Sequence, residues 1–277
     1  MKEKNLFDIL GRLNLVQEQA IELFYLLKAW KILSAKEIMD DSLKFSTFFT
    51  QKVESKKMLV IFDKLSKEHN VFKFYLNQNS NILKIDTDTL VSIYNAVEDD
   101  DSNITVNDAF YTQKGIRDFS ASNQIAELGV KLLNNDSKSI YIPFTNGFSY
   151  AYKTDKKIFA EDQNIRNAFI AELVRIVDGK DLEFVVNDAL DTPTYINLEA
   201  PHLLKEFESV LAFPPFGSRG KQDFSKDKFN RFKIHRGTNL DVAHFEHILV
   251  QCKEKAVVLV PVGFSYRTGS EDLFRQE

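Results

Sequence analysis

Cysteine, tryptophan, glycine and proline are all scarce in this sequence of 277 residues, which has 1 Cys, 1 Trp, 10 Gly and 6 Pro. The single cysteine, Cys252, excludes an intramolecular disulfide and a cysteine-based zinc cluster, and it predicts a reducing, cytoplasmic compartment. The low glycine and proline content excludes collagen-like chains. Long apolar runs are also absent, because the most apolar N-terminal stretch contains Glu18, Glu22, Lys28 and Lys31. We therefore expect no secretory signal and no membrane span.

Neither positively nor negatively charged residues are in large excess. The sequence has 36 Lys and Arg residues and 40 Asp and Glu residues, which gives a formal net charge of −4. A protein that coats nucleic acid carries a large positive excess. With 44% hydrophobic residues, the composition predicts an ordinary globular protein in which any contact with DNA is local.

The first 105 residues have the apolar spacing of helices. Apolar side chains recur there every three or four positions, in the stretches 6–33, 58–65 and 90–97. An Asp-Thr-Asp start signal at 86–88 precedes the last stretch. We predict a small α-helical domain over residues 1–105. The acidic run at 98–101 is the best candidate for a linker, and we expect it to be a solvated loop without a partner.

Residues 106–277 instead alternate short apolar strands with helices. The predicted strands are 139–144, 157–161, 183–187, 209–213 and 256–261, and the predicted helices are 125–133, 164–177 and 241–252. This alternation predicts an α/β domain with a parallel sheet that helices cover on both faces. Such sheets bind ligands beyond the carboxyl ends of their strands, so we expect the functional residues in those loops.

The most distinctive string, Phe213-Pro214-Pro215-Phe216, follows one of the predicted strands. It resembles the catalytic loop of DNA amino-methyltransferases, whose family form is Asn-Pro-Pro-Phe or Asn-Pro-Pro-Tyr. Further segments resemble, in the same order, the modification (M) subunits of type I restriction enzymes, which are N-6 adenine DNA methylases: residues 119–133, 139–150, 159–161, 187–190, 241–249 and 258–275. The resemblance implies a Rossmann-like, S-adenosylmethionine-dependent methyltransferase fold over residues 106–277. This domain is expected to be incomplete at its C-terminal side, without the last strands of the family's sheet, and to follow the helical domain that the family also carries.

The resemblance implies a modification subunit that transfers a methyl group from S-adenosylmethionine to the N-6 amino group of adenine. Its expected partners are double-stranded DNA and a specificity subunit or other restriction-modification subunits. An acidic side chain at the end of the second strand suits the ribose hydroxyls of a nucleoside cofactor, and Glu161 has this position. By resemblance, Asp188 contacts the cofactor's adenine. The positions implied for the cofactor are Ser122, Ile142, Gly147, Glu161 and Asp188.

Among the departures from the family pattern, two concern polar groups that are expected for catalysis and for the cofactor. In active relatives the Asn oxygen and a proline carbonyl accept hydrogen bonds from the target amino group, and the aromatic residue stacks on the flipped base. Pro214 and Phe216 keep the carbonyl and the ring, but the phenyl ring of Phe213 offers no acceptor. Ile142 likewise replaces the acidic residue of the first loop. Two hypotheses follow: an active methyltransferase, or a catalytically silent homologue that serves as a DNA-binding or assembly subunit.

A basic segment follows the proline loop. Residues 219–236 contain seven Lys or Arg residues and two Asp residues, with three phenylalanines interleaved. Basic groups beside a base-flipping site suit DNA phosphates, which gives the candidate contacts Arg219, Lys221, Lys228, Arg231, Lys233 and Arg236. A solvated loop whose phenylalanines pack inward is an equal alternative. His244 and His247 lack a third metal ligand at suitable spacing, so we predict polar positions on a helix face and no metal site.

Overall fold

The computed structural model describes residues 10–11, 15–36, 39–50, 53–78, 85–111, 121–133, 136–145 and 147–277. The chain divides into two compact units, which we call the helical unit (Met1–Arg117 and Ala168–Lys180) and the sheet unit (Asp118–Asn167 and Asp181–Glu277). Parts of the expected segments 6–33, 119–133 and 139–150 lie outside the described residues. The domain boundary at residue 105 remains a sequence-based prediction.

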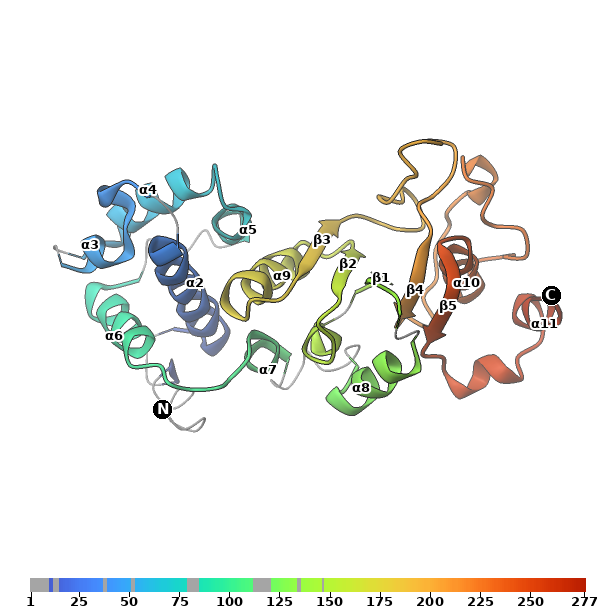
Figure 1. The fold of residues 1–277 in the computed structure, drawn as a ribbon, viewed down its shortest axis with the longest axis horizontal. Helices are drawn as coiled ribbons and strands as arrows, with labels where there is room; N and C mark the ends of the chain where they lie inside the picture. The colour runs from blue at the N-terminus through green and yellow to red at the C-terminus, as the bar shows by residue number, and fades with distance from the viewer. Residues whose placement is uncertain are drawn as a thin grey trace. The chain divides into compact units, whose positions relative to one another are not determined.

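The helical unit contains the expected helices (Figure 1). Its helices are α2 (Gln17–Lys36), α3 (Phe45–Phe49), α4 (Ser55–Leu65), α5 (Asn70–Gln78), α6 (Thr87–Glu98), α7 (Val106–Tyr111) and most of α9 (Ile165–Val177), with a 3-10 turn, η1 (Asp41–Leu43). Trp30 of α2 is fully buried, and its ring centroid lies 5.5 Å from those of both Phe48 and Phe62. Asp86 begins α6 by accepting a hydrogen bond from Thr89 N at 2.8 Å. No strand occurs among the described residues of this unit, as the apolar spacing predicts.

The acidic run at 98–101 is not a loop without partners, and this corrects the sequence-based expectation. Lys28 Nζ donates a hydrogen bond to Asp100 Oδ2 at 2.6 Å, and the Asp100 side chain is only 1% exposed. Asp100 Oδ1 accepts hydrogen bonds from the backbone N and the hydroxyl of Ser102. Burial opposes ionisation of Asp100, but the hydrogen bonds from Lys28 and Ser102 hold its pKa below the ordinary value. The run therefore anchors the end of α6 to α2, because a lysine on α2 reaches it.

The sheet unit contains a five-stranded sheet in the order β3-β2-β1-β4-β5, in which every neighbouring pair is parallel (Figure 1). The strands are β1 (Ser139–Pro143), β2 (Lys157–Asp162), β3 (Leu182–Val186), β4 (Phe207–Ala212) and β5 (Cys252–Val258). The helices are α8 (Asn123–Leu132), α10 (Asp241–Val250) and α11 (Ser270–Gln276), with 3-10 turns η3 (Ser149–Tyr152), η4 (Phe224–Lys226) and η5 (Val262–Ser265). The predicted α/β class with a parallel sheet is confirmed.

The predicted helix end and strand start around residue 252 are wrong in this unit. The sequence predicts a helix that ends at Cys252 and a strand over 256–261, but α10 ends at Val250 and β5 already begins at Cys252. After Cys252, β5 continues with the run Lys253-Glu254-Lys255, which is exposed, and the strand lies at an edge of the sheet. A charged run has no apolar strand pattern, so periodicity could not locate this start.

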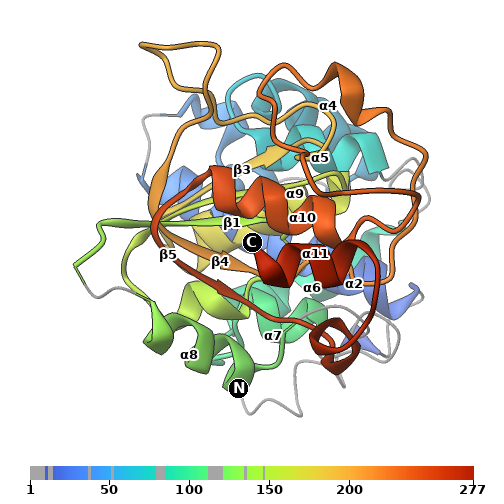
Figure 2. The ribbon, with the colours of Figure 1, turned by 90° about the vertical axis from the view of Figure 1, so that its right-hand side faces the viewer.

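The two faces of β4 are covered by different helices. Val210 and Ala212 pack with Ile248 of α10 on one face. Leu211 points to the other face, since successive side chains of a strand alternate. There α8 approaches so closely that a methyl group added at Gly129 would lie 2.8 Å from Leu211 Cδ1. Figure 2 shows α8 and α10 on opposite sides of the strands. Both faces of the sheet are therefore covered by helices at β4, as predicted.

Candidate functional site

A pocket of about 300 Å³ lies beyond the carboxyl ends of β1, β2, β3 and β4. This volume is at the lower end of the range for small-molecule sites, roughly 300–1,000 Å³. Its walls are formed by the last residues of β2, by residues that follow the other strands and by His244 of α10. The lining includes Phe144, Glu161, Asp162, Asp188, Pro215, Ser218, Arg219 and His244. Open α/β sheets bind their ligands at this position, so the pocket is the candidate functional site of the sheet unit.

Glu161, from the end of β2, is the most buried carboxylate of the pocket wall. Its side chain has no exposure to bulk solvent, although it borders the pocket. The Tyr141 hydroxyl donates a hydrogen bond to Glu161 Oε1, and Thr194 N donates one to Oε2 at 3.3 Å. Burial raises the pKa of Glu161, and these two hydrogen bonds oppose the rise. Glu161 is thus an oriented acceptor at the position where the sequence predicts a contact to ribose.

Asp162 and Asp188 complete this side of the pocket, and we call the three carboxylates the acidic wall. Asp162 Oδ1 accepts hydrogen bonds from Asn164 N at 2.7 Å and from Asn167 Nδ2 at 3.2 Å. Burial raises the pKa of Asp162 to about 6, and the negative charge of Asp188 adds to the rise. Asp188 Oδ1 accepts from Leu190 N at 3.0 Å, so one of its oxygens is used within its own turn. Sequence analysis missed Asp162, although it directly follows Glu161 at the strand end.

Three of the positions predicted for the cofactor do not line the pocket. Ser122 is the N-cap of α8, where its hydroxyl accepts from Ile125 N at 3.3 Å. Ile142 is buried within β1, in register with Ala160 of β2. Gly147 has a φ of +84°, which suits glycine at the turn after β1. Direct contact with a ligand at these positions remains a prediction.

The segment 213–217, which we call the proline turn, brings one of its residues into the pocket. Pro215 lines it, together with Ser218, whereas Pro214 is buried and Phe216 is half-buried. Gly217 N donates to Asp241 Oδ1 at 2.8 Å, which ties the turn to the start of α10. Phe213 is 8% exposed and follows Leu211 on the α8 side, where a methyl group at Gly129 would lie 3.8 Å from its Cζ. The turn and Glu161 therefore lie at the same edge of the sheet, and the Phe213 ring fills the interface with α8.

A buried network of hydrogen bonds continues from Glu161 through Tyr141 and His247 to Arg231. The Tyr141 hydroxyl lies 3.1 Å from His247 Nε2, and Arg231 Nη1 lies 2.9 Å from His247 Nδ1. All four side chains are almost fully buried. Burial, followed by the positive charge of Arg231, lowers the pKa of His247 well below its ordinary value, so the imidazole is neutral. Sequence analysis missed this network because its members come from distant segments and no local pattern connects them.

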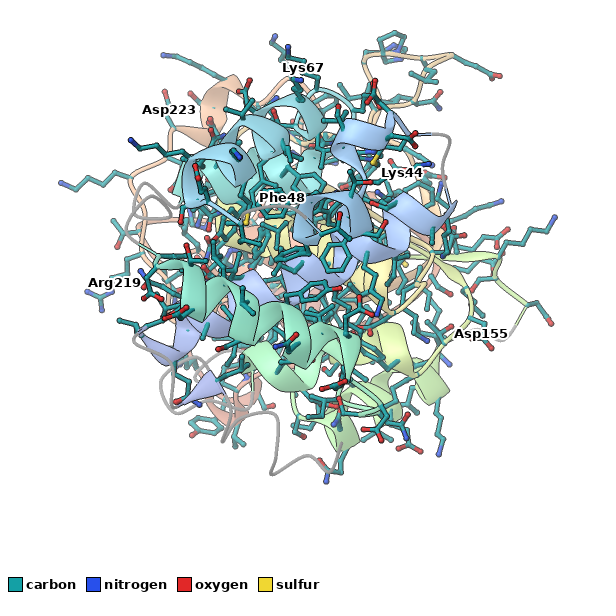
Figure 3. All side chains as sticks on the ribbon, turned by 90° about the vertical axis from the view of Figure 1, so that its left-hand side faces the viewer. Lys44, Phe48, Lys67, Asp155, Arg219 and Asp223 are labelled. Atoms are coloured by element: carbon teal, nitrogen blue, oxygen red, sulfur yellow. The ribbon has the colours of Figure 1, made fainter. Side chains whose placement is uncertain are left out.

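The basic segment 219–236 contains both exposed and buried side chains. Arg231 is 2% exposed and forms an ion pair with Asp227 at 2.8 Å, so its predicted contact with DNA phosphate is wrong for this structure. Phe224 and Phe232 pack against a core cluster of the unit, as the inward-packing alternative expects. The remaining predicted contacts are exposed: Arg219, Lys221, Lys228, Lys233 and Arg236. Figure 3 shows the Arg219 side chain extending outward from the ribbon.

His244 and His247 are buried, so their predicted place on a polar helix face is wrong. Helix α10 is covered on almost every side, and polar residues there need internal partners. The Phe144 ring packs edge-on against His244, with 4.5 Å between ring centroids. His244 Nδ1 and Ser218 Oγ are buried without a hydrogen-bond partner, and both residues line the pocket. Burial lowers the pKa of His244 to about 4, so this imidazole is neutral at neutral pH.

Within the described residues, no group of three or more His, Cys, Asp or Glu side chains could hold a metal ion. Over the same ranges, no helix combines the length and the apolar character needed to cross a membrane.

Comparison by sequence finds no matching family model and no significantly similar curated protein. Comparison by structure finds solved proteins with the same fold. The methyltransferase subunit of the type I restriction-modification system from Streptococcus thermophilus superposes with a TM-score of 0.69 at 13% identity, over 99% of this chain and 76% of that chain. A protein assigned as a modification subunit of a type I restriction enzyme from Vibrio vulnificus gives a TM-score of 0.62 at 12% identity, over 99% and 73% of the two chains.

A third structure, assigned as a class I S-adenosylmethionine-dependent methyltransferase from Listeria monocytogenes, gives a TM-score of 0.50 at 11% identity, over 93% of this chain and 79% of that chain. At such identities the likeness concerns the fold alone. The sheet unit thus has the Rossmann-like fold of S-adenosylmethionine-dependent methyltransferases, as the sequence predicts.

Proposed function

We propose that this protein is a homologue of type I modification subunits that binds S-adenosylmethionine in the pocket and acts on adenine in double-stranded DNA. The main observation behind the proposal is that Glu161, Asp188 and Pro215, from the ends of β2, β3 and β4, all line the same pocket. The fold shared with modification subunits supports it. The proposal includes a cytoplasmic location and a specificity subunit or other restriction-modification subunits as partners. It also assigns residues 1–105 to a helical domain and 106–277 to a methyltransferase-like domain.

The pocket residues fit a nucleoside cofactor on two sides. Glu161 and Asp188 offer carboxylate acceptors, which suit ribose hydroxyls and the amino group of an adenine. Ser218 Oγ and His244 Nδ1 are buried polar atoms that lack a partner, and a bound ligand would supply one. When bound, S-adenosylmethionine supplies an electrophilic methyl group on a positively charged sulfur. The chain's own contribution is to orient this ligand through the acidic wall and to exclude water with the Phe144 ring.

In this proposal the target adenine binds at the proline turn. The Pro214 carbonyl would accept a hydrogen bond from the amino group, and the half-buried Phe216 ring would stack on a flipped base. Exposed basic side chains of the following segment, Arg219, Lys221, Lys228, Lys233 and Arg236, would contact phosphates. Arg231 takes no part in DNA binding in this proposal, because its guanidinium is buried and bonded internally.

The second candidate is a catalytically silent subunit, and Phe213 favours it. Its ring lacks an acceptor and is packed on the α8 side of the turn. An amino group without its second acceptor in a desolvated site costs about 1–3 kcal/mol, which corresponds to a rate loss of roughly 10-fold to 100-fold. In this candidate the pocket and the basic segment keep ligand binding and DNA contact, and methyl transfer is lost.

Calorimetric titration of the full chain with S-adenosylmethionine, combined with incorporation of labelled methyl groups into DNA, tests both candidates. Binding with incorporation supports the enzyme, and binding without incorporation supports the silent subunit. Glu161→Gln is the matched control, since it removes the charge and keeps the size of the side chain; it should weaken binding by about tenfold or more. Absence of binding to the unmodified chain would overturn the proposal.

A further inference from the structure

We infer that Arg231, His247 and Tyr141 are positioning residues that fix the Glu161 carboxyl group as a hydrogen-bond acceptor. The pocket would then select ligands that present hydroxyl or amino donors at Glu161 and reject ligands that present phosphate or carboxylate there. This inference rests on the proposed ligand site, and it adds the residues that determine its selectivity.

The hydrogen bonds of the buried network can have only one donor-to-acceptor direction, and Arg231 determines it. A guanidinium group donates hydrogen bonds and cannot accept them, so His247 Nδ1 must be the acceptor of the 2.9 Å contact with Arg231. A neutral imidazole carries one proton, which is therefore on Nε2 and is donated to the Tyr141 oxygen at 3.1 Å. The single hydroxyl proton of Tyr141 is left for Glu161 Oε1. Each donor in this network has its acceptor.

Arg231 cannot turn away from this role, because the rest of its guanidinium is held on every side. Nε and Nη2 donate to Asp227 Oδ1 at 3.0 and 2.8 Å. Nη1 donates to the carbonyl of Ala189 and Nη2 to that of Leu190, both at 2.7 Å, and these two residues line the pocket. The Asp227 carboxylate balances the buried positive charge. The arginine is therefore an immobile donor behind the pocket wall.

The opposite end of the network fixes the carboxyl group itself. A proton on Glu161 Oε1 would point at the Tyr141 hydroxyl, whose own proton would then have to go to His247 Nε2. That arrangement needs the imidazole proton on Nδ1, against the guanidinium of Arg231, and is strongly disfavoured. Oε2 accepts from Thr194 N at 3.3 Å. Both oxygens are thus acceptors in the network, and an acceptor at this place suits a hydroxyl or amino group of a ligand and disfavours an anion.

The first test needs no ligand. Nitrogen-15 NMR of the full chain should show His247 as the neutral tautomer with its proton on Nε2, while Tyr141→Phe should keep this tautomer and remove the bond to Glu161. Arg231→Met should release the tautomer preference, and Lys226→Met, which removes an exposed charge of the same segment, should leave it unchanged. A proton on Nδ1 in the unmodified protein would overturn the inference. If Arg231→Met does not fold, the tautomer is measured in Tyr141→Phe, which removes only one oxygen.

The second test uses adenosine and adenosine 2′-monophosphate as probes. The unmodified protein and Lys226→Met should prefer adenosine by about tenfold or more, and Tyr141→Phe should reduce this preference severalfold. An unchanged preference in Tyr141→Phe would overturn the selectivity role. If neither probe binds the unmodified protein, the proposed function fails, and the tautomer of His247 alone then decides whether the network is directed as inferred.

Discussion

Asp162 should make the stability of this protein depend on pH in a way that Asp162→Asn removes. The pKa of Asp162 is raised in the folded state from 3.8 to about 6, chiefly by burial, whereas in the unfolded chain it keeps its ordinary value. The unfolded state therefore releases this proton first, and the folded state loses stability as the pH rises from 3.8 to about 6. A difference of about two pKa units corresponds to roughly 3 kcal/mol, an upper limit because the side chain is partly exposed.

Urea unfolding followed by circular dichroism measures this effect. Asp162→Asn keeps an acceptor oxygen for Asn164 N and Asn167 Nδ2 and removes the ionisation. The variant and the unmodified protein should be equally stable near about pH 3.5, and the variant should be more stable by up to about 3 kcal/mol above about pH 7. Asp155→Asn, at an exposed position, is the control and should show no such change. An Asp162→Asn difference that is the same at both pH values would refute the reasoning.

Three further predictions concern single features of the fold and the site. Ile142→Asp should lower the free energy of unfolding by at least about 3 kcal/mol in urea titrations, because Ile142 is buried in β1. The substitution should not strengthen binding of S-adenosylmethionine, because Ile142 does not line the pocket, and tighter binding would contradict this placement. Asp100→Asn should cost about 1–3 kcal/mol of stability through the lost bond to Lys28, and a change below about 0.3 kcal/mol would show that the contact contributes nothing. Lys228→Glu combined with Lys233→Glu should flatten the salt dependence of DNA binding, with a change of about 2 in the slope of log K against log salt. An unchanged slope would show that these two residues do not contact DNA.

The sequence predicts the sheet unit well where its strands are apolar. Buried runs such as those of β1, β2 and β4 are bounded by polar residues and turns, so their positions and their parallel arrangement follow from the pattern. For the same reason Glu161 and Asp188 are predictable as strand-end residues, and the structure brings both to one pocket. The start of β5 is not predictable, because an exposed edge strand of alternating charge has no apolar signature.

The buried polar contacts are the part that the sequence cannot supply. Tyr141 and His247 are separated by 106 positions and Arg231 and His247 by 16, and no motif connects them. In a basic segment, Arg231 looks like its neighbours Lys228 and Lys233, and only the tertiary structure distinguishes the buried guanidinium from the exposed ammonium groups. Asp100 shows the same limit, since its partner lies 72 positions away on α2.

A crystal structure of the full chain with S-adenosylhomocysteine would test the central claim most directly. The account predicts the nucleoside between the acidic wall and Pro215, with a ribose hydroxyl within hydrogen-bond distance of Glu161 and a ligand atom paired with Ser218 Oγ or His244 Nδ1. A nucleoside bound elsewhere, for example on the α8 face beside Phe213, or a crystal without the ligand at saturating concentration, would contradict it.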